Sequence, residues 1–354
     1  MTYLAGKIVL AVSAGAPNNG LGSGTVGEVK QARIHGRTYP YVSAQAFRRW
    51  LRETMVASGA VASPVTRVGK AEGKAQKATT GADPAQYPDD DLFGFMKATA
   101  KADNEATTLR DSPFMVGTFL SVEPVQVTKD WGVMSRGIGT PVIHEHQFYT
   151  ADLAAPFLLD LPRIGTFTYP DKSGSGKPNY LDEQSARRAA DAVAAGAVTA
   201  PFRGQTALRL PLEVRRERAA ILLEALGDLA GGAKKALHYG DRTPALIAMI
   251  PMAGGVNPLG FVVDGNEDGS GLEVRGGALR QELAAWQGEW DAPVRFGWRP
   301  GFRDQLRKQF EADLGDLIEG GQVSVDHPRS ELRALAGEIR GGERDAWFDD
   351  PQRP

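Results

Sequence analysis

The chain has 354 residues, a formal net charge of −2 at pH 7 and no cysteine. The length suits one large domain or two small ones, and the missing cysteines exclude disulfide bonds and cysteine-ligated zinc. The near-neutral charge gives the whole molecule no attraction to nucleic acid. No apolar run of about 18 residues is present and the first residues do not resemble a signal peptide. We therefore expect a cytoplasmic protein with no membrane partner.

The first predicted elements are a strand and a glycine-rich loop. Residues 7–13 form an apolar run typical of a buried strand, and residues 14–24 follow it as the loop. Bare amides in such a loop can cradle phosphate, but the Gly-Lys-Ser/Thr ending of a nucleotide-binding P-loop is missing. Asn18 in this loop either bonds a ribose or base edge or tolerates left-handed backbone. Residues 26–34 predict a second short strand.

Residues 43–55 predict an amphipathic helix with Ser43 as its N-cap. Successive helical residues are rotated by about 100°, so the apolar and polar side chains separate onto opposite faces. The apolar face comprises Ala44, Phe47, Trp50, Leu51 and Met55, and the polar face comprises Gln45, Arg48, Arg49 and Arg52. Three guanidiniums near a helix N-terminus suit a polyphosphate backbone. The alternative is the solvated basic face of an ordinary amphipathic helix.

Positive charge is concentrated around this helix. Residues 30–77 contain ten basic and two acidic residues, which is the local footprint of a nucleic-acid-binding surface. Gly, Ala, Lys, Thr and Pro dominate residues 57–88, and we interpret residues 58–112 as an insertion that projects from the core. The far end of the chain is acidic, with Asp345, Asp349 and Asp350, and this segregation of charge could let copies meet head to tail.

The later elements predict an α+β chain. Strands are predicted at residues 114–128, 140–150, 157–169, 245–252 and 259–264, and helices at residues 181–195, 212–229, 279–286, 302–317 and 330–339. The connector around residues 131–136 is predicted as a hairpin tip or loop. Strands that are split by helices without steady alternation argue against a doubly wound sheet.

Candidate metal and catalytic residues are few. His144 and His146 lie two apart on a predicted strand and face the same side. Because no third ligand has matching spacing, we interpret them as a structural or RNA-contacting pair rather than half a zinc site. Residues 264–269 match the start of a calcium loop, but Arg275 stands where a bidentate Glu is required. We expect no metal and no cofactor.

Three stretches resemble one known family. Residues 43–52 (Ser-Ala-Gln-Ala-Phe-Arg-Arg-Trp-Leu-Arg) resemble the Ser-x-Gln-x-x-(Lys/Arg)-Arg helix of the backbone subunit of the type I CRISPR Cascade complex. Residues 12–19 resemble the loop after that family's first strand. Residues 229–237, which contain Gly-Gly-Ala-Lys, are similar to a later segment of it. The likeness is to the DevR-like branch of the CRISPR-associated protein seven family, common in subtype I-B.

The resemblance implies an RNA-recognition-like (ferredoxin-like) core of the RAMP superfamily, with inserted fingers and thumb elements. Residues 1–57 would begin the core, residues 58–112 would form the fingers, and residues 113–354 would complete the core with a thumb-type hairpin and C-terminal helices. The resemblance further implies a non-catalytic subunit that polymerises head to tail along the spacer of a guide RNA (crRNA). Its partners would be the crRNA, target DNA through the crRNA, further copies, and the large, small, five-family and six-family Cascade proteins.

The resemblance also assigns candidate RNA-binding residues. Guide-RNA contact carries over to Asn18, Ser43, Gln45, Arg48, Arg49 and Arg52, and we add Lys234 and Lys235 from their charge and the adjoining glycines. A subunit that holds any spacer should contact phosphate and ribose and leave base edges free for pairing. Two alternatives stay open: an RNA-processing endoribonuclease of the same superfamily with His144 or His146 as general acid or base, and an unrelated metal-dependent hydrolase.

Overall fold

The structure is a computed structural model that describes residues 2–20, 26–68, 77–97, 108–134, 137, 139–140, 142–169, 180–181 and 186–350. All structural statements concern these residues. Lysines 70 and 74 of the predicted insertion lie outside them, and so do residues 170–179.

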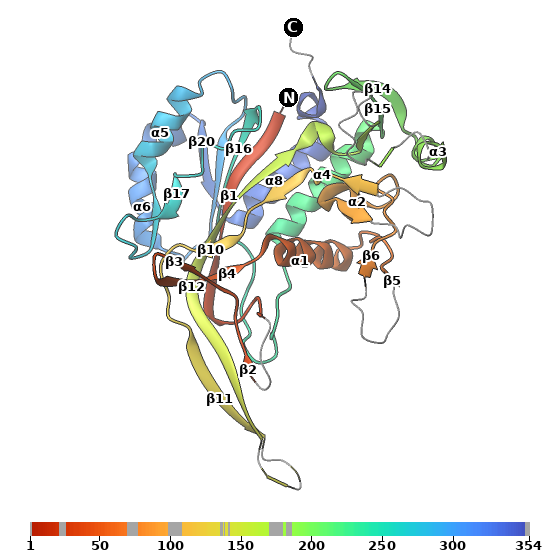
Figure 1. Ribbon diagram of the computed structural model, residues 1–354. Coiled ribbons are helices and arrows are strands. Elements are labelled where there is room, and N and C mark those ends of the chain that lie inside the picture. The colour runs from red at the N-terminus through yellow and green to blue at the C-terminus, as the bar shows by residue number, and fades with distance from the viewer. Residues whose placement is uncertain are drawn as a thin grey trace.

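Eleven of the described strands form one large mixed sheet, which runs through the centre of the molecule (Figure 1). They are β1 (Thr2–Gly15), β2 (Val26–Gly27), β3 (Gln31–Ile34), β4 (Arg37–Val42), β9 (Phe114–Val116), β10 (Phe119–Ser121), β11 (Thr128–Met134), β12 (Val142–Asp160), β16 (Leu246–Ala253), β19 (Val294–Trp298) and β20 (Val323–Asp326). The order is β20-β19-β16-β1-β12-β10-β4-β3, and β2, β9 and β11 also pair with β12. The β19–β20 and β2–β12 pairs are parallel and β1 is antiparallel to both of its neighbours.

Smaller sheets lie outside this one. They are β5 (Thr66–Val68) with β6 (Lys77–Thr79), β7 (Phe95–Lys97) with β8 (Thr108–Arg110), β13 (Thr166–Thr168) with β15 (Gln205–Arg209) and β14 (Val198–Phe202), and β17 (Val263–Gly265) with β18 (Leu272–Val274). The β5–β6 and β7–β8 hairpins belong to residues 58–112. The boundaries of the three predicted regions stay a prediction.

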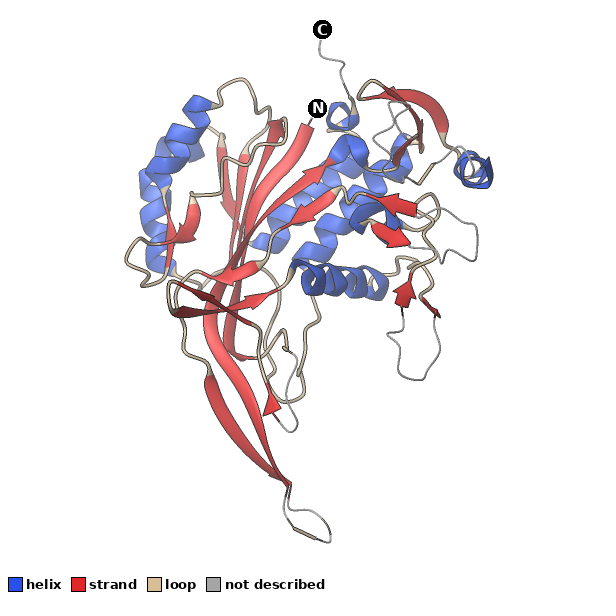
Figure 2. Ribbon diagram, viewed as in Figure 1, coloured by secondary structure: helices blue, strands red, loops and turns tan. Residues whose placement is uncertain are grey.

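Helices cover both faces of the large sheet (Figure 2). They are α1 (Ala44–Ala57), α2 (Pro88–Phe93), α3 (Ala186–Ala194), α4 (Leu212–Gly227), α5 (Gly276–Ala285), α6 (Asp304–Asp313), α7 (Gly315–Glu319) and α8 (Pro328–Gly341), with short 3₁₀ turns η2 (Leu161–Arg163) and η3 (Asp345–Phe348). None of the described helices is both long and apolar enough to cross a membrane.

The two faces of β1 explain the layering. Side chains alternate along a strand, and Leu4 and Ile8 pack in one buried cluster with α1, α4 and α8. Ala5 and Val9 pack in a second cluster with α5, α6 and the strands beside them. A strand that is apolar on both faces is expected to lie at the centre of a sheet covered on both sides, and the predicted buried strand at residues 7–13 is confirmed within β1.

The β11–β12 hairpin corrects two predictions. It extends away from the body of the molecule, opposite the N-terminus (Figure 1). Residue 131 was expected in a hairpin tip or loop, but Trp131 pairs with Glu145 inside β11, one strand of the hairpin. Residue 157 was expected to begin a new strand, but β12 continues to Asp160 and then turns through η2. Pro162, which cannot donate to a strand ladder, stands at that turn.

Other elements differ in detail. The single strand predicted for residues 114–128 is divided between β9 and β10, and most of residues 259–264 is a turn that precedes β17. The helix predicted for residues 302–317 is two helices, α6 and α7, that meet at Leu314. Strands β14, β15, β19 and β20 were not predicted. The predicted helices at residues 43–55, 212–229 and 330–339 are confirmed as α1, α4 and α8, with shifted ends.

Candidate nucleic-acid interface

Helix α1 is built as its amphipathic pattern predicts. Ser43 has extended backbone and its Oγ accepts a hydrogen bond from the amide of Ala46 at 3.4 Å. The predicted apolar side chains Phe47, Trp50, Leu51 and Met55 are all buried. Burial of a side chain of this size contributes about 1.5–3 kcal/mol. The packing leaves the opposite, polar side of α1 free to carry the arginines.

The three arginines of α1 have different surroundings. Arg49 is largely exposed and forms an ion pair with Glu53 at 2.8 Å. Arg52 forms an ion pair with the buried carboxylate of Asp89 at 2.9 Å and lies 5.1 Å from the ring centroid of Phe93. Two of the three guanidiniums are therefore already paired within the chain.

Arg48 is the α1 arginine without a carboxylate partner among the described residues. Its side chain is half-buried, and its Nε is buried without a hydrogen-bond acceptor. Burial lowers the pKa of Arg48, and the nearby positive charge of Arg52 lowers it further. A cation that is partly desolvated and uncompensated is available to an anionic ligand.

The loop after β1 meets the N-terminus of α1. The Oδ1 of Asn18 accepts a hydrogen bond from the amide of Ser43 at 3.0 Å. The carbonyl of Pro17 accepts one from the amide of Ala233 at 2.9 Å. The sequence singled out three segments, residues 12–19, 43–52 and 229–237. The first of them is thus in direct contact with both of the others. In this state the Asn18 amide oxygen is occupied by the protein itself.

The Gly-Gly-Ala-Lys segment docks on α1. The hydroxyl of Thr54 donates to the carbonyl of Ala230 at 3.1 Å and accepts from its amide at 3.0 Å. A Cβ on Gly231 would lie 2.8 Å from Trp50, and both Gly231 and Gly232 have positive φ, at 136° and 95°. Only glycine combines this backbone with so close an approach at low cost. The two glycines therefore have a structural reason to stand there.

Lys234 and Lys235 lie in the turn that follows. The Nζ of Lys234 is 3.3 Å from the carbonyl oxygen of Gly27 and 3.3 Å from the Nδ1 of His146, and partial burial lowers the pKa of this lysine. Lys235 is exposed. The turn thus holds one lysine against the root of the β11–β12 hairpin and presents the next to solvent.

The predicted residues form two groups around α1. Trp50, which contacts the Gly-Gly turn, and Arg48 are two residues apart, so they project about 160° from each other around the axis. One group lies on the Trp50 side of α1 or at its N-terminus and contains Asn18, Ser43, Lys234 and Lys235. The other group, Arg48 and Arg52, projects from the opposite side of α1. A helix with its side chains is about 10–12 Å wide. A ligand that touches both groups must be extended.

His144 and His146 lie on the same face of β12, as predicted, with ring centroids 4.7 Å apart. Because an ammonium can only donate, the contact with Lys234 makes the His146 Nδ1 the acceptor and places the proton on Nε2. Burial lowers the pKa of His146, and Lys234 lowers it further. The neutral ring therefore presents a hydrogen-bond donor rather than a free base.

No group of three or more His, Asp and Glu side chains among the described residues could hold a metal ion. The first position of the suspected calcium loop, Asp264, forms an ion pair with Lys7 at 3.2 Å. Asp268 accepts a hydrogen bond from the amide of Ser270 at 2.8 Å. The Asp264 carboxylate is thus paired with a lysine of β1, and Asp268 closes the turn itself.

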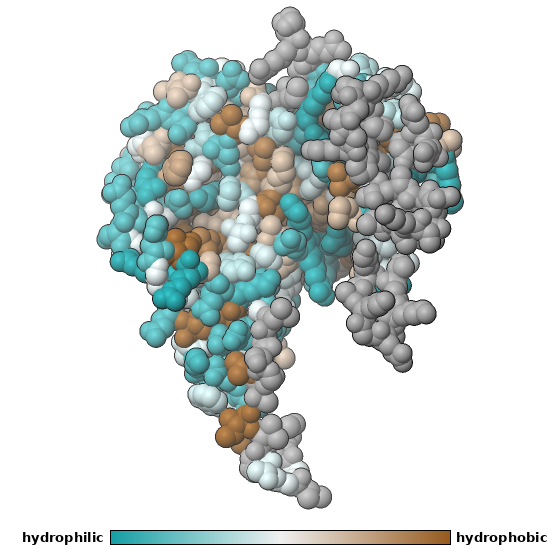
Figure 3. Space-filling model, in the orientation of Figure 1, coloured by the Kyte–Doolittle hydropathy of each residue, from teal (hydrophilic) through white to brown (hydrophobic). Residues whose placement is uncertain are grey.

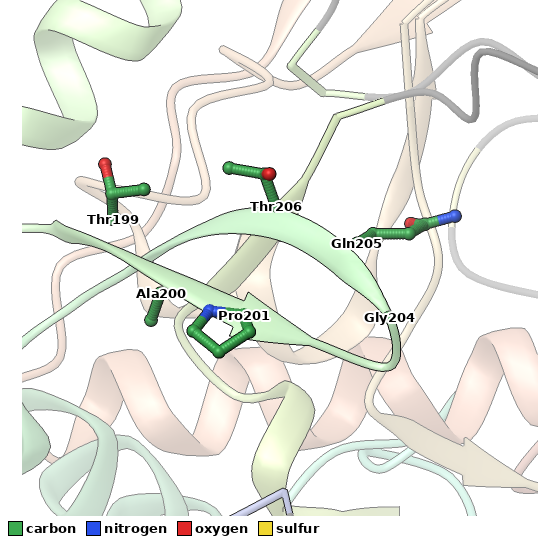
Figure 4. Close-up of a pocket in the computed structure, with 6 residues that line it drawn as sticks. All are labelled: Thr199, Ala200, Pro201, Gly204, Gln205 and Thr206. Carbon is green, nitrogen blue, oxygen red and sulfur yellow. The ribbon is translucent and has the colours of Figure 1, made fainter. Parts of the chain in front are cut away.

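A shallow pocket of about 380 Å³ lies on the β14–β15 hairpin (Figure 4). The pocket is lined by Thr199, Ala200, Pro201, Gly204, Gln205 and Thr206. None of these six side chains can titrate near neutral pH or act as a strong nucleophile. The pocket therefore does not compete with the α1 region as a site of chemistry.

Sequence reasoning missed exposed apolar residues on the β11–β12 hairpin. Trp131, Val133 and Ile143 are each more than half exposed, and apolar patches lie along the hairpin in Figure 3. Because paired residues share a face of an antiparallel ladder, these three lie on one side, opposite His144 and His146. Sequence reasoning also missed Arg242, a buried arginine beside the Gly-Gly turn. Its place in a glycine-bounded loop was the only sequence signal that could have found it.

No family model and no curated protein matches the sequence. Among solved structures, a chain of a CRISPR RNA-guided surveillance complex in a pre-nicking state aligns with a TM-score of 0.54 and 12% identity, over 95% of this chain and 100% of that one. A chain of another CRISPR RNA-guided surveillance complex aligns with a TM-score of 0.49 and 14% identity, over 95% and 99% of the two chains. This protein thus shares, over nearly its whole length, the fold of a chain from a CRISPR RNA-guided surveillance complex.

Proposed function

We propose that this protein is a non-catalytic, guide-RNA-binding subunit of a CRISPR surveillance complex of the Cascade type. The observation that carries the proposal is the meeting of three separate segments along α1. Residues 12–19 contact residues 43–52 at the N-terminus of α1, and residues 229–237 contact α1 at Trp50 and Thr54 and the first segment at Pro17. Each was singled out from its sequence, and the shared fold with a surveillance-complex chain supports the same role.

The chemistry of the meeting point suits a sugar-phosphate backbone. The first turn of α1 contains no acidic residue, and a helix N-terminus favours anions. Lys235 is exposed on one side of α1, and Arg48 on the other side has no carboxylate among the described residues. An extended RNA strand that crosses this helix end would reach both groups through phosphate contacts, without reading the bases.

We further propose that the chain is the backbone subunit of the complex. In that role copies follow one another along the crRNA, the β11–β12 hairpin serves as the thumb and residues 58–112 serve as the fingers. The length of the hairpin and its exposed apolar side support a contact with a neighbouring copy. Target DNA would be reached through the crRNA, and the large, small, five-family and six-family proteins would complete the complex.

The absence of RNA cleavage is part of the proposal. A nuclease that used His146 as general base would need an unprotonated ring nitrogen facing its substrate. In the structure that nitrogen is Nδ1, which is occupied by Lys234. Incubation of the purified protein with repeat-containing RNA should leave the RNA intact. Cleavage that disappears in His146→Ala would establish the nuclease instead.

Binding is tested by fluorescence anisotropy with single-stranded RNAs of unrelated sequence. Lys235→Ala combined with Arg48→Ala should weaken every RNA to a similar extent, by about tenfold for each charged side chain removed. Arg187→Ala is the matched control, because Arg187 is 93% exposed on α3, far along the chain from the candidate interface. Unchanged affinity of the double variant at moderate salt would refute the proposal.

A further inference from the structure

Arg242 lies beneath the Gly-Gly turn and is one of the most buried charged residues described, with 3% of its surface exposed. Its Nε and Nη2 are buried without any hydrogen-bond partner. Its Nη1 makes one long contact, 3.3 Å, with the carbonyl oxygen of the preceding residue. A buried guanidinium normally has its donors satisfied, since an unpaired one is costly.

The neighbouring carboxylate does not supply the missing partner. Asp241 forms an ion pair with Arg299 at 2.6 Å and accepts hydrogen bonds from the amide and hydroxyl of Thr243, each at 2.9 Å. Tyr149, which also faces Arg242, has a buried hydroxyl without a partner. Burial lowers the pKa of Arg242, and the nearby Asp241 carboxylate opposes this shift, but no described residue forms an ion pair with Arg242.

Three glycines surround the guanidinium. A Cβ on Gly232 would come within 3.1 Å of the Nε, one on Gly240 within 2.7 Å of the Nη1, and one on Gly15 within 3.8 Å of the Nη2. Gly232 and Gly240 are themselves partly exposed. The guanidinium of Arg242 is thus separated from solvent mainly by the backbone of Gly232 and Gly240, which have no side chains.

The same strip of backbone has unused donors. The amides of Gly231 and Gly232 donate to no described residue, whereas the flanking amides of Ala230 and Ala233 are bonded to Thr54 and Pro17. Successive glycine amides in such a turn are the usual backbone contribution to an anion site. Gly232 lies against the guanidinium of Arg242, and Gly231 before it is buried against Trp50.

We propose that the strip of backbone formed by Gly232 and Gly240 is an anion site for one phosphate of the RNA backbone, and that Arg242 supplies its positive charge from beneath. The inference rests on the proposed function and adds a residue to it. Arg242 is a positioning residue: it acts through the glycine backbone, and its uncompensated charge is satisfied when the phosphate binds. Because the charge is held in a low-dielectric setting, it attracts an anion more strongly than a solvated lysine does.

Arg242→Met tests the site through two measurements, the melting temperature of the free protein and the affinity for RNA, which are expected to change in different directions. In the free protein its melting temperature should equal or exceed that of the wild type, because an uncompensated buried charge is removed. With a 5′-labelled oligouridylate, affinity should fall about tenfold, and the slope of log K against log salt should decrease in magnitude by about 0.7, the value for one phosphate on a single strand. Arg242→Lys should retain most of the binding.

Arg215→Met is the matched control. Arg215 is equally buried, but it donates to the carbonyl oxygens of Ile164 at 2.8 Å, Pro162 at 3.1 Å and Phe348 at 2.8 Å. This variant should lower the melting temperature and leave the salt slope unchanged. If Arg242→Met behaves in the same way, Arg242 is a structural residue and the inference is overturned.

A second measurement separates this inference from the proposed function. Inorganic pyrophosphate at millimolar concentration should raise the melting temperature of the wild type and should not raise that of Arg242→Met. If pyrophosphate stabilises neither protein, or both equally, the anion site is refuted whatever the RNA result. If the wild type binds pyrophosphate in this way but binds no RNA, the site stands and the proposed function fails.

Discussion

Arg110 and Arg218 are buried almost as deeply as Arg242, in a different region of the molecule, where α2 meets α4. Both bond the carboxylate of Asp91, and Arg218 does so at 2.7 Å. Their remaining donors reach backbone carbonyls, among them those of Thr166, Pro84 and Ala85, each at 2.7 Å. In this region the two buried guanidiniums find their partners within the chain.

The region around the N-terminus of α1 differs in this respect. Arg48 and Arg242 both keep buried nitrogen atoms without partners, while the arginines next to them in sequence or space, Arg52 and Arg299, are paired. Arg203 also has a buried Nε without a partner, but its Nη2 is paired with Asp160 at 2.8 Å. A protein stabilises itself by completing its polar contacts, so buried arginines that lack an ion pair as well indicate where a ligand completes them. The comparison separates arginines that hold the fold from arginines available for binding.

The strongest test of this comparison is Asp91→Asn. The substitution keeps the shape of the side chain but leaves Arg110 and Arg218 buried without their counter-ion, which should cost about 3–5 kcal/mol of unfolding free energy. Urea denaturation measures it. Asp130→Asn, at an exposed carboxylate on the hairpin, should change stability little. A loss below about 1 kcal/mol at Asp91 would show that the buried network does not hold the fold.

Arg48→Ala tests an arginine that has no ion-pair partner among the described residues. It should weaken binding of unrelated RNAs about tenfold, because one charged hydrogen-bond donor to the RNA is removed, and should leave the melting temperature close to that of the wild type. Arg49→Ala should weaken binding less than Arg48→Ala, since its exposed guanidinium is paired with Glu53. Anisotropy titrations at two salt concentrations measure both variants. If Arg48→Ala and Arg49→Ala reduce RNA affinity equally, the ion pair of Arg49 does not affect its contribution to binding, and the comparison of paired with unpaired arginines is wrong.

Ser43→Ala should destabilise the protein by about 1 kcal/mol through loss of the α1 N-cap. Because Ser43 Oγ is engaged with the Ala46 amide, we expect a smaller effect on RNA affinity than Arg48→Ala has. Thermal unfolding and anisotropy on the same samples give the two values. Ser58→Ala, at the C-terminal end of α1, serves as the control. A loss of affinity without a loss of stability would instead make Ser43 a direct RNA contact.

The smallest expected effect is a pH dependence at the hairpin root. Burial and Lys234 lower the folded-state pKa of His146 below its ordinary value of 6.5. As pH falls below about 6.5, His146 is protonated in the unfolded chain before it is protonated in the folded protein. The stability that the neutral ring supplies is therefore lost as pH falls through the lower, folded pKa. The drop in melting temperature between about pH 7.5 and pH 5.5 should be smaller in His146→Asn. Equal drops would exclude His146 as its source.

Local patterns predicted much of the fold where neighbouring residues decide the structure. The apolar residues of α1 recur at helical spacing after a serine cap, and burial of that face follows directly. The strand at β1 was recognisable because it is apolar on both faces. By contrast, the glycines at 132, 137 and 139 made β11 look like a loop. Its strand conformation comes from pairing with β12, which a local pattern does not show.

Some features of the candidate site could be predicted from local sequence, and others could not. Residue type and spacing singled out the loop after β1, the α1 arginines and the Gly-Gly-Ala-Lys segment, and the structure brings all three segments into contact. Which arginine is free could not be predicted, because Asp89 lies 37 residues from Arg52. Arg242 could not be recognised either, since its burial without a hydrogen-bond partner for Nε and Nη2 appears only in the folded chain.

Short-range sequence features were enough to predict the amphipathic helix, the central strand and the glycine segments, because periodicity, capping and backbone freedom act over a few residues. Which charges are neutralised, which amides stay unused and how far the β11–β12 hairpin extends became apparent in the folded chain. Those properties depend on contacts between residues far apart in the chain, and the free energy of a buried charge is set by the partners that folding brings to it.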